Sequence, residues 1–225
     1  RDVAVTGVQT CALPISYRSG WASTNFGAYF ISGAFVVGAG GVVIAMYIFR
    51  THTKLEKYIT DDHFDKMSKV LVLLALLYLY FNFNEFLVPA FKMKKSEEDQ
   101  LLGLFTGEFA PIFWFAIFTS MFIPIFILLF KKGRKPIPAF IAGILVVVGS
   151  WFKRFLIVTP TLLHPFLPMH DVPMNYHYYI PTWEEWAIAG GSLAGVLLII
   201  TIFARLFPIV PIHETIIETE QHEKH

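Results

Sequence analysis

The sequence contains a single cysteine, Cys11, among its 225 residues. One cysteine cannot form a disulfide bond within the chain. It also excludes a cysteine-ligated iron–sulfur cluster or a cysteine-based zinc site held by this chain alone. A redox centre that works with this protein therefore belongs to a partner or is a diffusible molecule, and we expect the chain itself to bind no cofactor and no metal.

Charged residues are also scarce. They make up 16% of the chain, whereas 55% of the residues are hydrophobic and 16% are aromatic. A soluble domain carries about 25% charged residues. The sequence has no clustered basic surface of the kind that nucleic acid requires, and no phosphate-binding loop or nucleophile motif, so those classes are set aside. The composition predicts an all-α membrane protein.

Five apolar runs are long enough to cross a bilayer as helices of roughly 22 residues. They lie at about residues 26–49, 67–91, 109–130, 137–158 and 183–207. We therefore predict five transmembrane helices of the four-helix-bundle type. The third run contains Pro124. A proline inside a helix removes a backbone donor, so we expect this helix to bend.

Residues 17–212 form the predicted transmembrane domain, flanked by two segments of different character. Residues 1–16 (RDVAVTGVQTCALPIS) lack the basic start and long apolar run of a signal peptide. They resemble translated sequencing-adapter sequence, so we predict that they are not native and that the natural protein is longer at its N-terminus. Residues 213–225 are polar and acidic, and we predict a cytoplasmic tail there.

Lysine and arginine are distributed unevenly between the predicted loops. The first and third loops together hold eight of them, namely Arg50, Lys54, Lys57, Lys66, Lys131, Lys132, Arg134 and Lys135. The second and fourth loops together hold three, Lys92, Lys94 and Lys95. By the positive-inside rule, the first and third loops and the C-terminus lie in the cytoplasm, and the chain begins outside.

The eight histidines all lie outside the apolar runs. A cytochrome b bundle needs axial haem ligands, usually histidines, at depth within its helices. The sequence therefore argues against haem b in this chain.

Glu85 is the first candidate for chemistry, because it lies roughly 9 Å inside the end of the second span. An ionisable group at such a place usually faces a partner or a wet cavity. Asn82 lies on the same helix face, and Lys153 and Arg154 lie at similar depth on the fourth span. Adjacent residues on a helix point about 100° apart, so only one of these two cations can readily face Glu85.

Two interpretations of this cluster remain open. It is either a proton-handling or quinone-headgroup site at the outer face, or a structural ion pair in which Lys153 extends toward the lipid headgroups. His63 and Asp65, where the second span begins, form a second candidate. They could pass protons into the bundle, since histidine titrates near neutral pH. The alternative is that acidic residues here only stabilise the start of the helix.

Several stretches resemble the NrfD/PsrC family, which comprises membrane subunits of polysulfide reductases and related quinone-linked enzymes. They are residues 21–30 (WASTNFGAYF), 63–69 (HFDKMSK), 84–86 (NEF), 153–158 (KRFLIV), 181–186 (PTWEEW) and 206–212 (LFPIVPI). The resemblance is greatest to the NrfD-like quinol-oxidising subunit of alternative complex III, and five spans would correspond to the C-terminal half of that fold. Where the family commonly has an acid before the arginine of this span, the chain has Lys153.

This resemblance implies a function that the protein does not perform alone. It would bind a quinol, menaquinol or ubiquinol, near the outer face of the bacterial cytoplasmic membrane. Electrons would pass to an iron–sulfur partner subunit of a respiratory chain complex that contains other membrane subunits, and protons would move through polar residues of the bundle. In the family the quinone site lies mainly in the other half of the fold. The alternatives are a secondary transporter or ion-conducting protein, which would show broken helices near the midplane, and a structural membrane anchor.

Overall fold

The computed structural model describes residues 25–52, 56, 58–92, 101–163 and 181–206. Residues 1–16 and the tail at 213–225, which the sequence distinguishes from the predicted transmembrane domain, lie outside the described residues. Within it the long elements are helical and no strand occurs, and five helices are long and apolar enough to cross a membrane. The predicted all-α fold with five spanning helices is confirmed.

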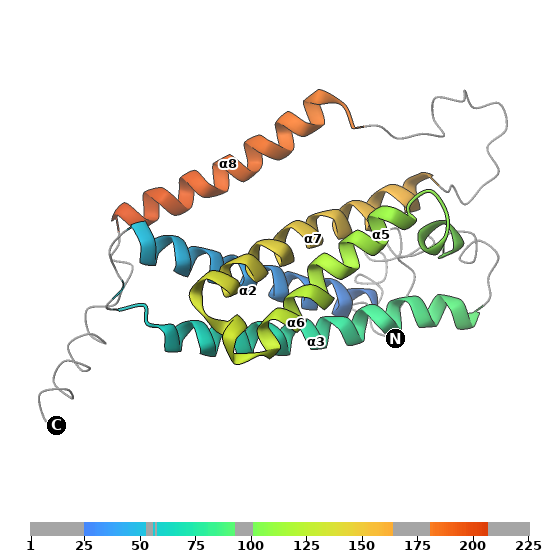
Figure 1. The fold of residues 1–225 in the computed structure, drawn as a ribbon. Helices are drawn as coiled ribbons and strands as arrows, with labels where there is room; N and C mark the ends of the chain where they lie inside the picture. The colour runs from blue at the N-terminus through green and yellow to red at the C-terminus, as the bar shows by residue number, and fades with distance from the viewer. Residues whose placement is uncertain (1–24, 53–55, 57, 93–100, 164–180, 207–225) are drawn as a thin grey trace, which may run out of the picture. The chain divides into compact units, whose positions relative to one another are not determined.

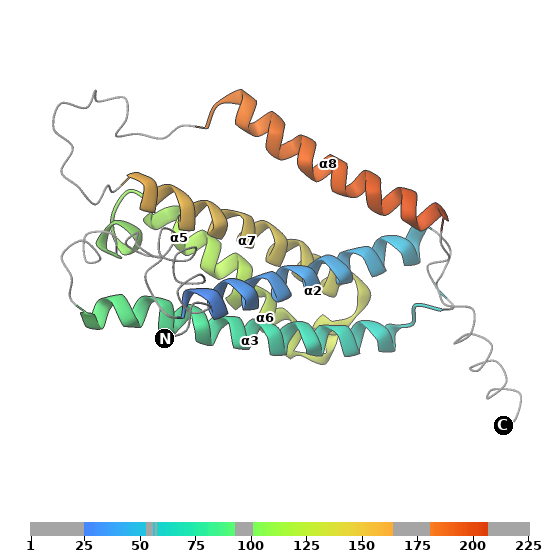
Figure 2. The same ribbon diagram turned by 180° about the vertical axis from the view of Figure 1, so that it is seen from behind.

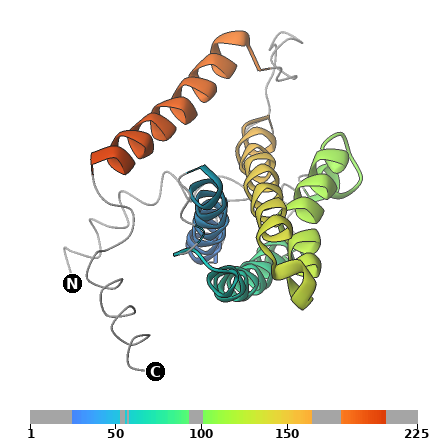
Figure 3. The same cartoon turned by 60° about the vertical axis from the view of Figure 1, so that its left-hand side comes forward.

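The first four spans belong to one compact unit, residues 1–174. They are α2 (Phe26–His52), α3 (Asp61–Lys92), a third span in three parts, and α7 (Pro136–Leu163). Helix α2 packs against α3 and α7, and the third span packs along the other side of α7. Figures 1 and 2 show these four spans running alongside one another, and Figure 3 shows α7 between α2 and α5 from another side.

A seven-residue spacing explains which face of α3 is buried. Its buried residues alternate in steps of four and three along the helix, namely Phe64, Ser68, Leu71, Ala75, Tyr78, Asn82 and Glu85. This spacing places them in one stripe that faces neighbouring helices. We call this stripe the α3 seam. It becomes polar toward its C-terminal end, where Tyr78, Asn82 and Glu85 follow one another.

Helices α2 and α7 come close together at two glycines. A Cβ atom added to Gly143 would lie 3.0 Å from the carbonyl oxygen of Gly40, and one added to Gly40 would lie 3.2 Å from Val146 Cγ1. Small residues permit such close contact, and van der Waals packing is a main source of helix association in lipid. Gly40 of the first span and Gly143 of the fourth therefore serve helix packing.

The third span consists of α5 (Ala110–Ile117), a π-helical segment η2 (Phe118–Phe122) and α6 (Ile123–Leu129). In the wider turn the amide of Ile123 donates to the carbonyl of Phe118. Pro124 follows directly, so the π segment lies where its missing N–H and its ring would disturb a regular helix. The sequence predicted a bend of the third span at this proline. The structure has a π-helical segment directly before it.

The segment η3 (Lys131–Arg134) is a 3-10 turn that joins α6 to α7. Arg134 fastens this connection, because its Nε donates to the carbonyl of Leu128 at 2.8 Å and its NH2 group to that of Leu129 at 3.0 Å. A third guanidinium donor reaches Asp65 of α3 at 3.3 Å. One side chain thus stabilises the C-terminus of α6 and ties it to the start of α3.

The fifth span, α8 (Trp183–Leu206), belongs to the second unit, residues 175–225. It begins with Glu184 and Glu185 in its first turn and ends with Arg205 in its last. Acidic residues at the start of a helix and a basic one at its end complement the helix dipole. The Glu185 carboxylate also accepts a hydrogen bond from the amide of Thr182 at 2.8 Å, which stabilises the helix start.

Candidate functional site

Lys153 is the most deeply buried cation that the structure describes, with 3% of its surface exposed. It projects from α7, and its Nζ donates a hydrogen bond to Asn82 Oδ1 on α3 at 3.3 Å. A buried ammonium group is unfavourable unless it is hydrogen-bonded and paired. The side chains around Lys153 therefore determine whether α3 and α7 can pack here.

Two aromatic rings provide part of that environment. Lys153 Nζ lies 4.8 Å from the centre of the Phe86 ring and 5.2 Å from that of Phe113. Phe86, Phe105 and Phe113 contact one another edge to face, with centroid distances of 5.0–5.6 Å. A cation against a ring face is attracted by the ring quadrupole, most strongly where water is excluded. Lys153 thus lies between an aromatic cluster and Asn82.

Glu85 is the second charged group buried here, with 9% of its surface exposed. Its negative charge acts on Lys153 and also on Tyr29 of α2. Glu85, Asn82 and Tyr78 lie on the same face because they are the last three residues of the α3 seam. The structure therefore brings together three of the residues singled out from the sequence, Glu85, Asn82 and Lys153.

Sequence reasoning missed Tyr29 and Tyr78. Their rings stack with centroids 5.5 Å apart and an interplanar angle of 16°, and Tyr78 Oη donates to Tyr29 Oη at 3.5 Å. Gly33 makes room for this pair, because a Cβ atom there would lie 2.9 Å from Tyr78 Cε2. For Tyr78 the signal in the sequence was its spacing of four and seven residues from Asn82 and Glu85, which places it on the same face of α3.

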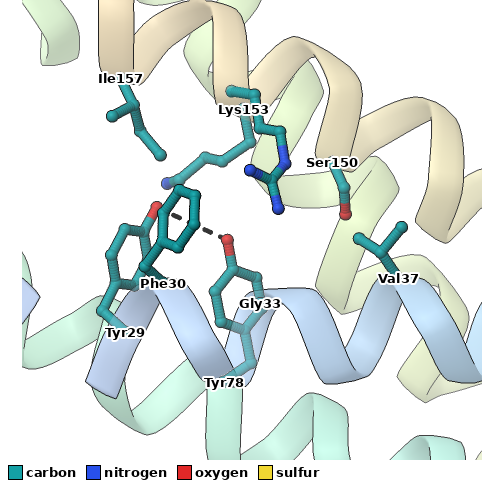
Figure 4. Close-up of a pocket in the computed structure, with 9 residues that line it drawn as sticks. Tyr29, Phe30, Gly33, Val37, Tyr78, Ser150, Lys153 and Ile157 are labelled. Carbon is teal, nitrogen blue, oxygen red and sulfur yellow. Dashed lines mark hydrogen bonds between the residues drawn. The ribbon is translucent and has the colours of Figure 1, made fainter. Parts of the chain in front are cut away.

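A small pocket lies between α2, α3 and α7, beside Lys153. Its lining consists of Tyr29, Phe30, Gly33, Val37, Tyr78, Ser150, Lys153, Arg154 and Ile157. Its cavity volume is about 20 Å³. The hydroxyls of Tyr29 and Tyr78 point toward α7, and Lys153 extends from α7 toward them (Figure 4). The pocket thus adjoins the cluster of Lys153, Asn82 and Glu85.

Arg154 lies at the rim of this pocket and is exposed, in contrast to its neighbour Lys153. Its guanidinium carbon lies 4.7 Å from the centre of the Phe30 ring on α2. The angle of about 100° between adjacent helix positions accounts for the contrast. Lys153 therefore faces Asn82, and Arg154 is available at the pocket mouth.

His63 and Asp65 lie at the opposite end of α3, about 30 Å from Glu85 at the helical rise per residue. His63 Nδ1 lies 2.8 Å from Thr60 Oγ1, at the start of the helix. Asp65 forms ion pairs with Lys69 and Arg134. The structure gives both residues contacts that stabilise the helix start and the η3 connection, and it does not bring them to Glu85.

Metal coordination finds no support in this part of the chain. Among the residues that the structure describes, no group of three or more His, Cys, Asp or Glu side chains is placed to hold a metal ion. The chemistry available at the site is that of an ammonium, a carboxylate, an amide, hydroxyls and a guanidinium. These groups can donate hydrogen bonds to an oxygen-containing ligand and exchange protons with it.

Comparisons with known proteins reveal two similarities. The profile of the family described as "Polysulphide reductase, NrfD" matches residues 3–165, which include the first four spans. The chain is also 25% identical over 194 residues to a selenate reductase subunit of Mesobacillus selenatarsenatis, an alignment that covers 84% of this chain and 44% of that protein. The chain thus spans less than half the length of this curated relative.

Proposed function

Because this chain belongs to the NrfD family of polysulphide reductase membrane proteins, we propose that it is a multi-pass membrane subunit of a quinone-linked respiratory oxidoreductase. In this proposal the protein helps to bind a quinol, and it couples quinol oxidation to proton movement. The electrons pass from the quinol to an iron–sulfur cluster in a partner subunit. The relative named as a selenate reductase subunit supports the broader class of respiratory oxidoreductase.

The observation that carries the proposal is the burial of Lys153 and Glu85 within spanning helices. Ionisable residues at membrane depth are costly, by about 2.5–3.5 kcal/mol at the centre of a single helix. Such residues are retained chiefly where they serve ion, proton or substrate pathways. Here they adjoin a pocket whose rim carries Arg154.

The chemistry of a quinol suits this arrangement. Its two-electron oxidation to the quinone releases two protons and two electrons. The electrons require an acceptor that this single-cysteine chain does not itself supply, so the proposal assigns them to the partner's cluster. A carboxylate such as Glu85 can accept a proton, and Arg154 at the pocket mouth can donate a hydrogen bond to a quinone oxygen.

The cavity of about 20 Å³ is too small to admit an aromatic headgroup. We therefore place the quinol ring outside the cavity, beside Arg154 and Phe30, in accord with a site to which this chain contributes a rim. By the lysine and arginine distribution, this end of the bundle faces the outside of the bacterial cytoplasmic membrane.

The test is quinol oxidation by the full complex purified from a host membrane, with Glu85→Gln in this protein. We expect the rate to fall by about a hundredfold or more, since proton transfer by a positioned side chain typically contributes that much. The matched control is Glu108→Gln, which changes an exposed carboxylate near the start of α5 and should leave the rate unchanged.

Two results would contradict the proposal. One is an unchanged rate of quinol oxidation in the Glu85→Gln complex. The other is purification of the intact protein without any iron–sulfur partner, which would favour the alternative of a secondary transporter or an ion-conducting protein.

A further inference from the structure

The small pocket between α2, α3 and α7 has a mixed lining, and one of its polar groups, the Ser150 hydroxyl, lacks a hydrogen-bond partner among the described residues. Ser150 is buried, with 6% of its surface exposed. Within the described residues, its hydroxyl oxygen has no hydrogen-bond partner. Serine hydroxyls inside a spanning helix often donate to a carbonyl one turn earlier, as Ser120 does to Ala116 at 2.6 Å. Ser150 instead lines the pocket.

We propose that this pocket binds one ordered water molecule, which joins Lys153 to the hydroxyls of Ser150 and Tyr78. The size of the cavity supports this ligand. A cavity of about 20 Å³ exceeds the roughly 10–15 Å³ that a single water requires. A larger ligand does not fit.

The lining also supports water. A buried water needs two to four polar partners. Ser150 Oγ, Tyr78 Oη, Tyr29 Oη and Lys153 Nζ all belong to residues of the lining, on three different helices. Figure 4 shows the two tyrosine hydroxyls joined by their hydrogen bond and the Lys153 side chain extending from α7 on the same side as these hydroxyls, with Ser150 farther along α7. An apolar cavity of this size would remain dry, whereas this one offers enough partners.

The donors and acceptors are compatible with a specific orientation of the water. Lys153 has three N–H donors, and Asn82 Oδ1 accepts one of them. A water lone pair can accept another. The Tyr78 hydroxyl donates to Tyr29, so its own lone pairs can accept a proton of the water. The second proton of the water can go to Ser150 Oγ.

This water would complete a hydrogen-bonded chain from Asn82 through Lys153, the water and Tyr78 to Tyr29. A proton passing from Lys153 Nζ to the water is balanced by one passing from the water to Tyr78, one from Tyr78 to Tyr29, and one from the Tyr29 hydroxyl to a carboxylate, a role that the proposal gives to Glu85, whose charge acts on Tyr29. The net result is the transfer of one proton with no change in oxidation state. A role for this chain in coupling rests on the proposed function, whereas the water site itself does not.

Radiolytic footprinting of the full complex tests the site. An X-ray pulse produces hydroxyl radicals from water, and mass spectrometry locates the side chains that they modify. Tyr29 and Tyr78 are almost fully buried, so bulk water should not label them. We expect both to be modified in the native protein. Met121, which is reactive but fully buried outside the pocket, should remain unmodified.

Substitutions of Ser150 identify the partner of the water. Ser150→Val removes the hydroxyl that holds the water, so labelling of both tyrosines should fall to the level of Met121. Ser150→Thr retains a hydroxyl and should retain the labelling. Ser68→Val is the matched control, because Ser68 is fully buried and its hydroxyl also lacks a partner in the described part of the chain, yet it lies outside the pocket.

The outcomes are distinct. Absence of label on Tyr29 and Tyr78 in the native complex overturns the water site, and so does equal labelling in the native and Ser150→Val complexes. Labelling of Met121 together with the tyrosines would assign the signal to general opening of the bundle and would also overturn it. Because footprinting needs no turnover, each of these results is independent of quinol oxidation.

The relay has its own test. If the water carries protons, Ser150→Val should slow proton release during quinol oxidation by about a hundredfold, the scale of a lost proton-transfer group. Ser150→Thr should restore the rate. An unchanged rate in a Ser150→Val complex that has lost its tyrosine label would overturn the relay while leaving the water site and the proposed function intact.

Discussion

Lys153 of α7 donates a hydrogen bond to Asn82 of α3 at 3.3 Å, inside a bundle of spanning helices. The two residues lie 71 positions apart in the chain. Their contact places an ammonium group where lipid and apolar side chains surround the helices. Asn82 Oδ1 and the ring of Phe86 contact this group, and the buried carboxylate of Glu85 acts on its charge.

This interdependence predicts strong coupling between Lys153 and Glu85. Lys153→Met leaves the buried carboxylate of Glu85 without the ammonium group on which its charge acts, and an uncompensated buried charge typically costs about 3–5 kcal/mol. The double variant Lys153→Met/Glu85→Gln removes both charges. We expect it to recover most of the lost free energy of unfolding, measured by denaturation in detergent. Lys132→Met, at an exposed lysine, is the control.

Additive effects in the double variant would contradict this prediction, because they would show that the two charges do not sense each other. They would also favour a role for Lys153 that is limited to its hydrogen bond with Asn82. A coupling free energy is informative here, since it excludes losses that each substitution causes independently.

The approach of α7 to the π segment predicts a second effect. A Cβ atom at Gly149 would lie 2.5 Å from the backbone nitrogen of Ser120, a distance that backbone atoms cannot relieve without moving a helix. Gly149→Ala should therefore lower the free energy of unfolding by about 1–3 kcal/mol, as overpacking does. Thermal unfolding of the purified protein measures it. Gly38→Ala is the control, because nothing lies within 4 Å of that position.

Much of the fold could be predicted from the sequence because apolar runs of spanning length leave few alternatives. The second helix nevertheless begins at Asp61, several residues before the predicted start of its apolar run at 67. Asp61 and Asp62 extend it, since acidic residues are favoured in a first turn. Hydropathy alone does not detect such a polar extension. The limits of the transmembrane domain at residues 17 and 212, and of the cytoplasmic tail at residues 213–225, stay predictions.

The site could be predicted only in part. Burial of an ionisable residue inside an apolar run is visible in the sequence, so Glu85, Lys153 and Asn82 were found. Tyr29, Tyr78 and Ser150 were not, because tyrosine and serine are ordinary residues in a spanning helix and only the packing of three helices brings them together. For His63 and Asp65 the sequence left open a proton path and a helix start, and their contacts are with Thr60, Lys69 and Arg134 at the start of α3 and at η3.

Arg134 leads to a third prediction. Its guanidinium donates to the carbonyls of Leu128 and Leu129 and to Asp65, which a planar fork can do simultaneously. Arg134→Lys keeps the charge but loses that geometry. We expect it to destabilise the protein by about 1–3 kcal/mol, close to the effect of Arg134→Gln. Chemical denaturation compares the two. Full retention of stability in Arg134→Lys would show that charge alone suffices.

The aromatic cluster beside Lys153 leads to the last prediction. The ring of Phe86 faces the ammonium group at 4.8 Å, and a desolvated contact of this kind contributes about 2 kcal/mol. Phe86→Leu keeps an apolar side chain but removes the ring face. Its effect on the free energy of unfolding should be larger in the native protein than in Lys153→Met, where no cation remains. Equal effects in both backgrounds would assign Phe86 to packing with Phe105 and Phe113 alone, because those contacts persist after the cation is removed.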